Sequence, residues 1–282
     1  MCEKFKFFIL TSVFLLVFLS CNSTKKREEQ DIASRMQRVE TLMSEDRWSA
    51  AKIELDSIHI LHPRAISARR TARAMQDTII VRENLRTLAF LDSILPIKRH
   101  QRDSISRNFR FEKDERFQTT GNFVHRSLQI EQNFTRNYLR AFIDENANFF
   151  LVSHFTGANR SNHTSVRASV GELFATTDTI PLSSPFNHSF SEGGTTWETI
   201  TFRNETAGNL PAFVAQFANE RIRIELTGGR NVVYFLADTD RRALIETFNL
   251  WVAMSDVLIL EREIAKANAI IEHIRQRNTA AE

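Results

Sequence analysis

Glycine is scarce in this sequence, and its eight copies are confined to one window. The first is Gly121 and the last is Gly229, so the 120 residues before the window and the 53 residues after it contain none. Three of the five prolines lie in the same window. Because glycine and proline mark turns and interrupt helices, this distribution predicts a helical front, a turn-rich middle and a helical tail.

Cysteine is almost absent, with only Cys2 and Cys21. Two such residues exclude a disulfide-stapled small domain and a zinc site built from cysteine pairs. Apolar residues make up 42% of the chain and charged residues 25%, which argues against a disordered, collagen-like or multi-span membrane protein. The length of 282 residues is typical of one or two globular domains.

Residues 1–20 predict an export signal. A basic start is followed by thirteen mostly apolar residues, Phe7 to Leu19, a run too short to span a membrane. The run ends in Phe18-Leu19-Ser20-Cys21, which resembles the lipobox of bacterial lipoprotein precursors. The resemblance implies that Cys21 is the acylated N-terminus and that membrane lipid is its partner. The alternative is an ordinary secretory signal, or a plain membrane anchor, with an incidental cysteine.

An acylated Cys21 implies a location in the cell envelope, on the inner or outer membrane and either periplasmic or surface-exposed. Residues 21–30 are then expected to form a polar tether, because they offer little apolar surface to pack. Cys2 leaves with the signal, so the mature chain is expected to form no internal disulfide.

Residues 31–120 predict a helical domain that begins with a helical hairpin and continues in a long helix over 65–95. The second half of the hairpin resembles a tetratricopeptide repeat, on the residues Asp46-Arg47-Trp48, Ala51, Leu55, Ile58 and Pro63. Repeat solenoids need about three units to bury a continuous core, so we expect one repeat-like hairpin and no array. After Pro96 the segment to Thr120 predicts either a kinked continuation of the helix or a connecting arm.

Residues 121–237 predict a β-rich domain. Apolar and polar residues alternate over 221–226, Gly228-Gly229 follows, and 232–237 is apolar, which together indicate a hairpin. Pro211 predicts the start of a short covering helix. Further strands are expected at 138–143, 149–155, 165–170 and 196–202. Five or six strands with one helix favour an antiparallel sheet or a small barrel.

Residues 238–282 predict one long C-terminal helix, because a broad apolar stripe runs through them without glycine or proline. Such a helix is longer than a small sheet can cover. We therefore expect it to return along the helical arm and to pack antiparallel against 65–95. The predicted fold class is α+β.

The net charge of +3 is unevenly distributed. Residues 25–118 contain 20 Lys/Arg and 15 Asp/Glu, whereas residues 119–282 contain 15 and 18. A mildly basic front close to a membrane anchor could contact anionic lipid headgroups or envelope polymers, although a solvated helix face explains the same pattern. The interleaved acids and the export signal argue against a nucleic-acid partner.

Four histidines of the middle region are the best candidates for a ligand site: His125, His154, His163 and His188. Their spacing fits no metal-binding motif, and the sequence has no nucleophile elbow, phosphate-binding loop or dinucleotide fingerprint. We therefore predict no catalytic residue, no metal and no cofactor. Polar side chains satisfied by local hydrogen bonds are the plainer interpretation of these histidines.

The triplet Asp-Ser/Thr-Ile occurs five times, with hydroxyl residues Ser57, Thr78, Ser93, Ser104 and Thr179. It resembles the O-glycosylation sequon of exported proteins of the Bacteroidota, which implies that these hydroxyls carry glycans. The same triplet also arises where an amphipathic helix turns toward the core.

These observations favour a membrane-anchored envelope lipoprotein that acts as a scaffold or protein-interaction module without catalysis, with envelope proteins as partners. One alternative is an exported binding module for a peptide, glycan or lipid. Another is an envelope hydrolase that uses the middle histidines. A concave pocket that joins two of the four histidines to a carboxylate or hydroxyl would favour the hydrolase. A filled sheet core with a long exposed helical face would favour the scaffold.

Overall fold

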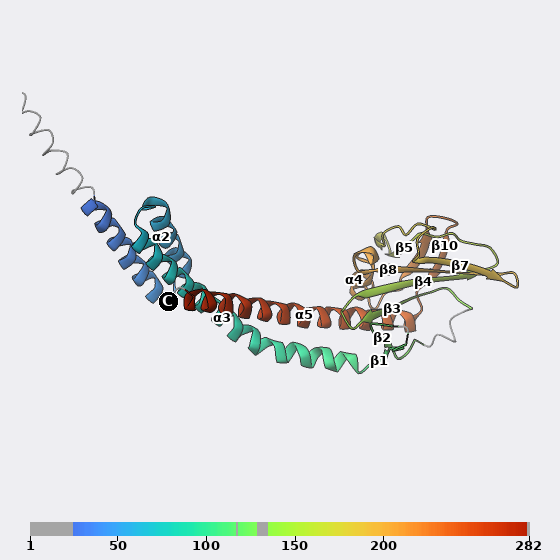
Figure 1. The fold of residues 1–282 in the computed structure, drawn as a ribbon. Helices are drawn as coiled ribbons and strands as arrows, with labels where there is room; N and C mark the ends of the chain where they lie inside the picture. The colour runs from blue at the N-terminus through green and yellow to red at the C-terminus, as the bar shows by residue number, and fades with distance from the viewer. Residues whose placement is uncertain (1–24, 117, 129–134, 281–282) are drawn as a thin grey trace, which may run out of the picture. The chain divides into compact units, whose positions relative to one another are not determined.

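The computed structural model describes residues 25–116, 118–128 and 135–280, and its fold is α+β, as predicted. The chain divides into two compact units. The helical unit consists of the described residues up to Asp92 and from Glu263 onward, and the sheet unit spans Ser93–Arg262. Two long helices, α3 (Ile66–Ser106) and α5 (Asp238–Thr279), contribute to both units (Figure 1).

In the helical unit, a helix over 25–44 and α2 (Trp48–Leu61) form the predicted hairpin. The turn between them places Asp46 at a φ of +56°, a left-handed conformation that aspartate tolerates better than most residues. The hairpin packs on the first half of α3 through six fully buried side chains: Val39, Ala51, Leu55, Ile58, Ala72 and Ile79. Residues 25–30, which we expected to belong to a polar tether, are helical.

Helix α3 continues through Pro96 to Ser106. Proline cannot donate the backbone hydrogen bond of a helix interior. For this reason the sequence alone does not distinguish a continued helix after Pro96 from a connecting arm. The expected helical domain is too long at its C-terminal end, because strand β1 (Phe109–Glu112) lies within it. The pattern Phe-Arg-Phe-Glu alternates as a strand does, but four residues among many charges give a weak signal.

The sheet unit contains two antiparallel sheets, and neither closes into the barrel that we had considered. The first has the order β1-β2-β3-β4-β8-β7, in which the other strands are β2 (Asn122–His125), β3 (Tyr138–Asp144), β4 (Phe149–Gly157), β8 (Thr195–Arg203) and β7 (Asn187–Glu192). The second has the order β10-β9-β5-β6, with β10 (Val232–Phe235), β9 (Arg223–Thr227), β5 (Ser165–Val170) and β6 (Leu173–Thr176).

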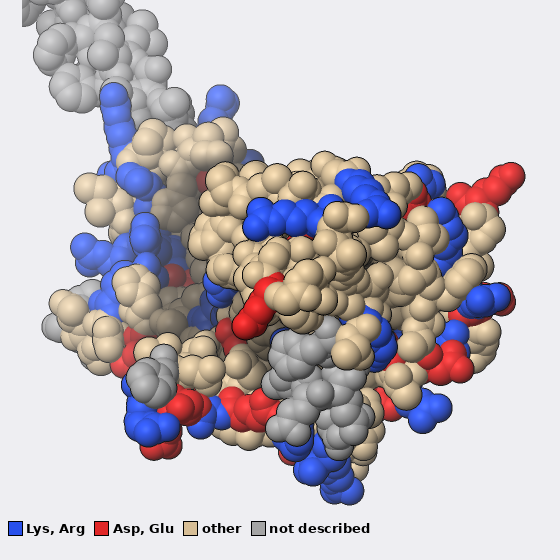
Figure 2. Space-filling model, turned by 90° about the vertical axis from the view of Figure 1, so that its right-hand side faces the viewer, with Lys and Arg blue, Asp and Glu red and all other residues tan. Residues whose placement is uncertain are grey.

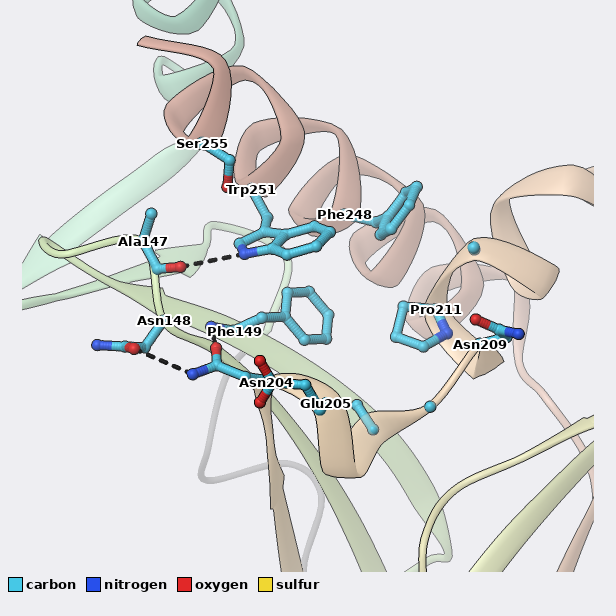
Figure 3. Close-up of a pocket in the computed structure, with 13 residues that line it drawn as sticks. Ala147, Asn148, Phe149, Asn204, Glu205, Asn209, Pro211, Phe248, Trp251 and Ser255 are labelled. Carbon is cyan, nitrogen blue, oxygen red and sulfur yellow. Dashed lines mark hydrogen bonds between the residues drawn. The ribbon is translucent and has the colours of Figure 1, made fainter. Parts of the chain in front are cut away.

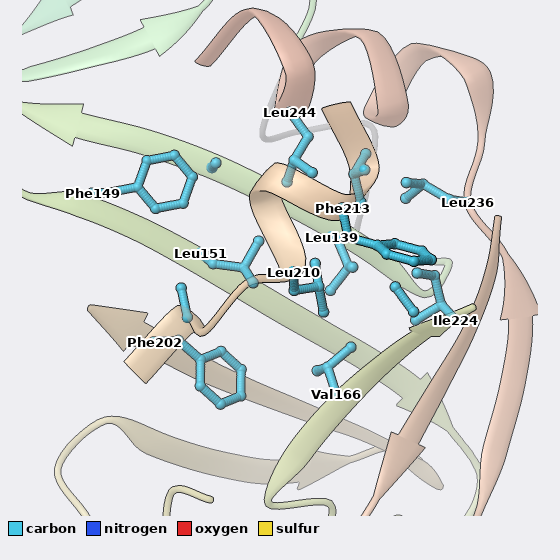
Figure 4. Close-up of a cluster of buried hydrophobic side chains, with 14 of the residues drawn as sticks. Leu139, Phe149, Leu151, Val166, Phe202, Leu210, Phe213, Ile224, Leu236 and Leu244 are labelled. Carbon is cyan, nitrogen blue, oxygen red and sulfur yellow. The ribbon is translucent and has the colours of Figure 1, made fainter. Parts of the chain in front are cut away.

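One hydrophobic core holds the sheet unit together (Figure 4). Because successive strand residues point to opposite faces, Leu139 of β3, Leu151 of β4 and Phe202 of β8 share one inner face. Val166 and Ile224 of the second sheet belong to the same core. The short helix α4 (Leu210–Gln216), which begins as predicted around Pro211, adds Leu210 and Phe213, and α5 adds Leu244.

Helices α3 and α5 pack antiparallel, as predicted. In the helical unit, Asp77 of α3 pairs with Arg277 of α5. In the sheet unit, Lys98 Nζ lies 2.7 Å from Asp256 Oδ2. Among the described helices, α5 alone has a stretch apolar enough and long enough to cross a membrane, but a core helix meets the same test, and its Leu244 and Leu250 are fully buried.

The charged surface of the sheet unit is mixed. Figure 2 shows one face, on which basic and acidic side chains are interspersed around a wide uncharged area. Charges of opposite sign on the same face partly cancel in the electrostatic field that they produce.

Candidate functional site

A cavity of about 440 Å³ opens in the sheet unit beside α5. Three segments surround it: the turn between β3 and β4, the segment that joins β8 to α4 through the 3-10 turn Asn204–Ala207, and one face of α5 (Figure 3). The lining residues are Ala147, Asn148, Phe149, Asn204, Glu205, Ala207, Gly208, Asn209, Pro211, Ala212, Phe248, Trp251 and Ser255. Its volume lies within the usual range for small-molecule pockets, roughly 300–1,000 Å³.

Aromatic rings form much of the cavity wall. Phe248 and Trp251 lie three residues apart on α5, so both project to the same side of that helix. The ring centroid of Trp251 lies 5.7 Å from that of Phe248 and 5.8 Å from that of Phe149. Figure 3 shows Pro211 facing these rings across the space. The wall is thus largely apolar and rigid, because aromatic side chains have few rotatable bonds.

Hydrogen bonds fix the backbone around the cavity. Trp251 Nε1 donates to the carbonyl oxygen of Ala147 at 3.0 Å, and Ala147 has a φ of +58°. The Phe149 backbone N–H donates to Asn204 Oδ1 at 2.8 Å, and Asn204 Nδ2 donates to Asn148 Oδ1 at 3.0 Å. These bonds tie the β3–β4 turn both to α5 and to the segment after β8.

Three polar side chains at the cavity retain their bonding capacity. The Glu205 carboxylate, the Asn209 amide and the Ser255 hydroxyl form no hydrogen bond or ion pair with another described residue. They supply a charged acceptor, a combined donor and acceptor, and a hydroxyl. A few polar groups around an apolar wall are the usual composition of a ligand pocket.

A second polar cluster lies buried at the inner face of β4 and β8. His163 Nε2 lies 3.1 Å from Ser153 Oγ, and His163 Nδ1 lies 3.0 Å from Glu198 Oε2. Ser161 Oγ donates to Glu198 Oε2 at 2.5 Å. Because a carboxylate only accepts hydrogen bonds, the Nδ1 atom of His163 carries the proton that faces Glu198.

This cluster has the connectivity of a serine–histidine–carboxylate relay, but it is enclosed. Ser153 is 0% exposed, His163 1% and Glu198 3%. Burial raises the pKa of Glu198, but hydrogen bonds from His163, Ser161 and the Asn162 backbone N–H have the larger opposite effect and lower this pKa to about 2. The carboxylate therefore stays charged and anchors the loop before β5 to the sheet.

The four candidate histidines do not converge on one site. His125 Nε2 lies 2.9 Å from Glu246 Oε2 and ties β2 to α5. His154 lies on β4, one residue from Ser153 and therefore on the opposite face, where it stacks on Tyr138 with ring centroids 4.6 Å apart. Burial, reinforced by the charge of Arg140, lowers the pKa of His154 to about 4. His188 is exposed on β7.

None of these histidines lines the aromatic cavity. Within the described residues there is also no group of three or more His, Cys, Asp or Glu side chains arranged to hold a metal ion. The sequence predicted a ligand site at the histidines, whereas the cavity is lined by residues expected to belong to the core or to loops.

The helical unit contains another cavity, of about 560 Å³, between α3 and α5. Ile80, Ile270 and Ile274 supply apolar surface, and Arg73 and Lys266 add charge at its edge. Asp77 and Arg277 also line it, but they neutralise each other in an ion pair. Among the described lining residues there is no Phe, Tyr or Trp, and the imidazole of His273 is the ring that contributes.

The predicted modification sites fall in different surroundings. Cys21 lies outside the described residues. Ser57 is half-buried on α2, and Thr78, Ser93 and Ser104 are exposed on α3. Thr179 is exposed in the segment after β6.

Sequence reasoning missed the cavity. Phe248 and Trp251 lie within the apolar stripe of residues 238–282, and their spacing does not distinguish a pocket wall from a core. Glu205 and Asn209 sit between two elements, where caps and turns are expected. Comparison with protein-family models, with curated proteins and with solved structures finds no match for this chain.

Proposed function

We propose that this chain is a membrane-anchored protein of the bacterial cell envelope whose sheet unit binds a small ligand in the cavity beside Trp251. The envelope location follows from the signal-like residues 1–20 and from Cys21. The observation that carries the binding proposal is the cavity itself, in which an aromatic wall meets Glu205, Asn209 and Ser255.

The surroundings of the cavity support a ligand site over a packing defect. A packing defect in a core is apolar, closed and small, whereas this cavity has side chains with unused hydrogen-bonding capacity. The hydrogen bonds from the Phe149 backbone N–H to Asn204 and from Trp251 to the Ala147 carbonyl hold its walls in place before any ligand arrives. Such preorganisation lowers the entropic cost of binding.

The binding proposal can be tested with a library of neutral and charged fragments. We would record saturation-transfer NMR on the full chain in phosphatidylglycerol nanodiscs and compare it with the variant Ala212→Trp. Ala212 is an exposed residue that lines the cavity, so a tryptophan there fills the space without disturbing the core. Fragments that bind the wild type and lose binding in the variant support the proposal. Identical binding by both proteins contradicts it.

The anchor is tested separately. Labelled palmitate should enter the wild-type protein in cells and should be lost in Cys21→Ala. An unlabelled wild type would overturn the lipoprotein part of the proposal and leave the cavity unaffected.

A scaffold role is the second candidate, and the helical unit supplies its observation. Ile53 and Ile60, seven residues apart on one face of α2, are 67% and 76% exposed. Leu61 and Ile66 beside the α2–α3 turn are also exposed. Aliphatic side chains clustered in this way are typical of protein-interaction surfaces.

The scaffold candidate can be tested with a photo-crosslinking residue in intact cells. Placed at Ile60 it should capture one specific envelope protein, whereas the same residue at the exposed Arg82 of α3 should not. Equal capture at both positions would argue against an interaction surface on α2.

A further inference from the structure

Among the residues that the structure describes, one charged side chain lines the aromatic cavity, and it is negative. Glu205 is an exposed carboxylate, and the other lining residues are neutral. No Lys, Arg or His belongs to the lining, and Glu205 takes part in no ion pair among the described residues. The cavity therefore presents an uncompensated negative charge next to an apolar wall.

The aromatic wall has the same electrostatic preference. The face of an aromatic ring carries partial negative charge, and a cation over the ring of tryptophan gains the most. Trp251, Phe248 and Phe149 supply three rings with centroids less than 6 Å apart in neighbouring pairs. Elsewhere in the sheet unit, arginines already cover rings, as Arg167 does with Phe174 at 3.8 Å. No such arginine covers Trp251 among the described contacts.

We propose that this cavity binds an organic cation, a quaternary ammonium group whose methyl groups contact Trp251 and its neighbouring rings while Glu205 balances the charge. The inference rests on the proposed function, because it specifies the ligand of the same site. Asn209 and Ser255 are placed to bind a polar substituent of that cation. Quaternary ammonium groups fit such rings because they are bulky, weakly hydrated and unable to donate strong hydrogen bonds.

A neutral sugar or alcohol could also use Asn209 and Ser255, but it would gain nothing from the negative field. The comparison that isolates the charge uses choline and 3,3-dimethylbutan-1-ol, in which carbon replaces the ammonium nitrogen and the shape is kept. Both ligands are titrated calorimetrically into the full chain in phosphatidylglycerol nanodiscs, since these lipids carry no choline.

We expect choline to bind about tenfold more tightly than the alcohol, or more, as cation–π attraction and one carboxylate together allow. Glu205→Gln should weaken choline binding by about three- to tenfold and leave the alcohol unchanged. The matched control is Glu172→Gln, in the exposed β5–β6 turn and without a described partner, and it should change neither affinity.

Equal affinity for choline and the alcohol, or an unchanged choline affinity in Glu205→Gln, would overturn the inference and leave the cavity as a ligand site. If neither choline nor the alcohol binds, while neutral fragments still bind the wild type and not Ala212→Trp, the organic-cation inference is overturned and the ligand site remains. Failure of every fragment to distinguish Ala212→Trp from wild type would instead remove the proposed function.

Discussion

His163 Nδ1 lies 3.0 Å from Glu198 Oε2 at the inner face of the six-stranded sheet, and both side chains are almost completely buried. The second oxygen of the carboxylate accepts the Asn162 backbone N–H at 3.0 Å. Among the described residues, all hydrogen-bond partners of this carboxylate lie within residues 161–163. The pair therefore serves to fix the loop before β5, and the enclosed Ser153 has no exposed surface from which to attack a substrate.

Removing the charge of Glu198 should destabilise the sheet unit. We expect Glu198→Gln to lower the free energy of unfolding by about 3 kcal/mol, because the buried donors of Ser161, Asn162 and His163 lose a charged acceptor. Urea unfolding followed by circular dichroism measures the change. Glu192→Gln, exposed at the end of β7, is the control and should stay within about 0.5 kcal/mol. A loss below about 1 kcal/mol in Glu198→Gln would show that the pair is not a main anchor of the loop.

Stability should fall at acid pH in two steps. The folded-state pKa of His154, about 4, lies below the unfolded value of 6.5, so its contribution is complete above pH 6.5 and is lost as the pH falls toward 4. Glu198, with a pKa of about 2 against 4.5, contributes fully above pH 4.5 and loses this contribution between 4.5 and 2.

The variant His154→Phe separates these steps. A phenyl ring keeps the stacking on Tyr138 but cannot take up a proton, so the slope between pH 6.5 and 4.5 should flatten while the step below pH 4.5 remains. Unfolding free energies measured across this range give both slopes. An unchanged slope in His154→Phe would show that His154 does not control this part of the pH dependence.

Burial predicts unequal occupancy of the five Asp-Ser/Thr-Ile triplets if they are modified in the folded chain. Ile58 and Ile79, the third residues of the first two triplets, are fully buried. We therefore expect glycans on Ser93, Ser104 and Thr179 and little or none on Ser57 and Thr78. Mass spectrometry of glycopeptides from the native protein measures occupancy at each site. High occupancy at Ser57 or Thr78 would contradict this order, and an unmodified intact mass would remove the sequon interpretation.

The end of α5 should stabilise the helical unit. Ala267, Ile271 and Ile274 are almost fully buried there, so deleting residues 263–282 exposes the α3 surface that they cover. We expect the helices of 25–92 to melt at lower temperature by circular dichroism. Deleting only residues 279–282 is the control and should change little. Unchanged melting in the longer deletion would contradict the pairing of α5 with α3 in this unit.

The sequence predicted elements with a long or regular pattern and missed short polar ones. The alternation over 221–226 led to β9, and the apolar stripe led to α5. Strand β7, Asn187–Glu192, has one apolar residue in six, and β6 has only four residues, so neither pattern rises above that of a loop. Their place in the sheets is set by pairing with β8 and β5.

One residue of the buried cluster did leave a signal in the sequence. Thr196, Glu198, Ile200 and Phe202 share the inward parity of β8, so a carboxylate stands among core positions. A buried carboxylate needs partners, and the structure supplies them from the loop at 161–163. The cavity could not be predicted from the residue pattern of one segment in the same way. Its walls come from the β3–β4 turn, the segment after β8 and α5, which are separated by up to about a hundred residues of chain.

The fluorescence of Trp251, made the only tryptophan of the chain, reports directly whether a small ligand enters the cavity. In a chain with Trp48→Phe and Trp197→Phe, we would titrate the fragment that binds most tightly in the NMR screen. We expect a saturable change in Trp251 emission. The control adds Ala212→Phe to this chain, because phenylalanine fills the cavity without adding a second tryptophan, and it should abolish the change. Unchanged Trp251 emission at fragment concentrations that saturate the protein would show that small ligands bind elsewhere, and would rule out the cavity beside Trp251 as the ligand site.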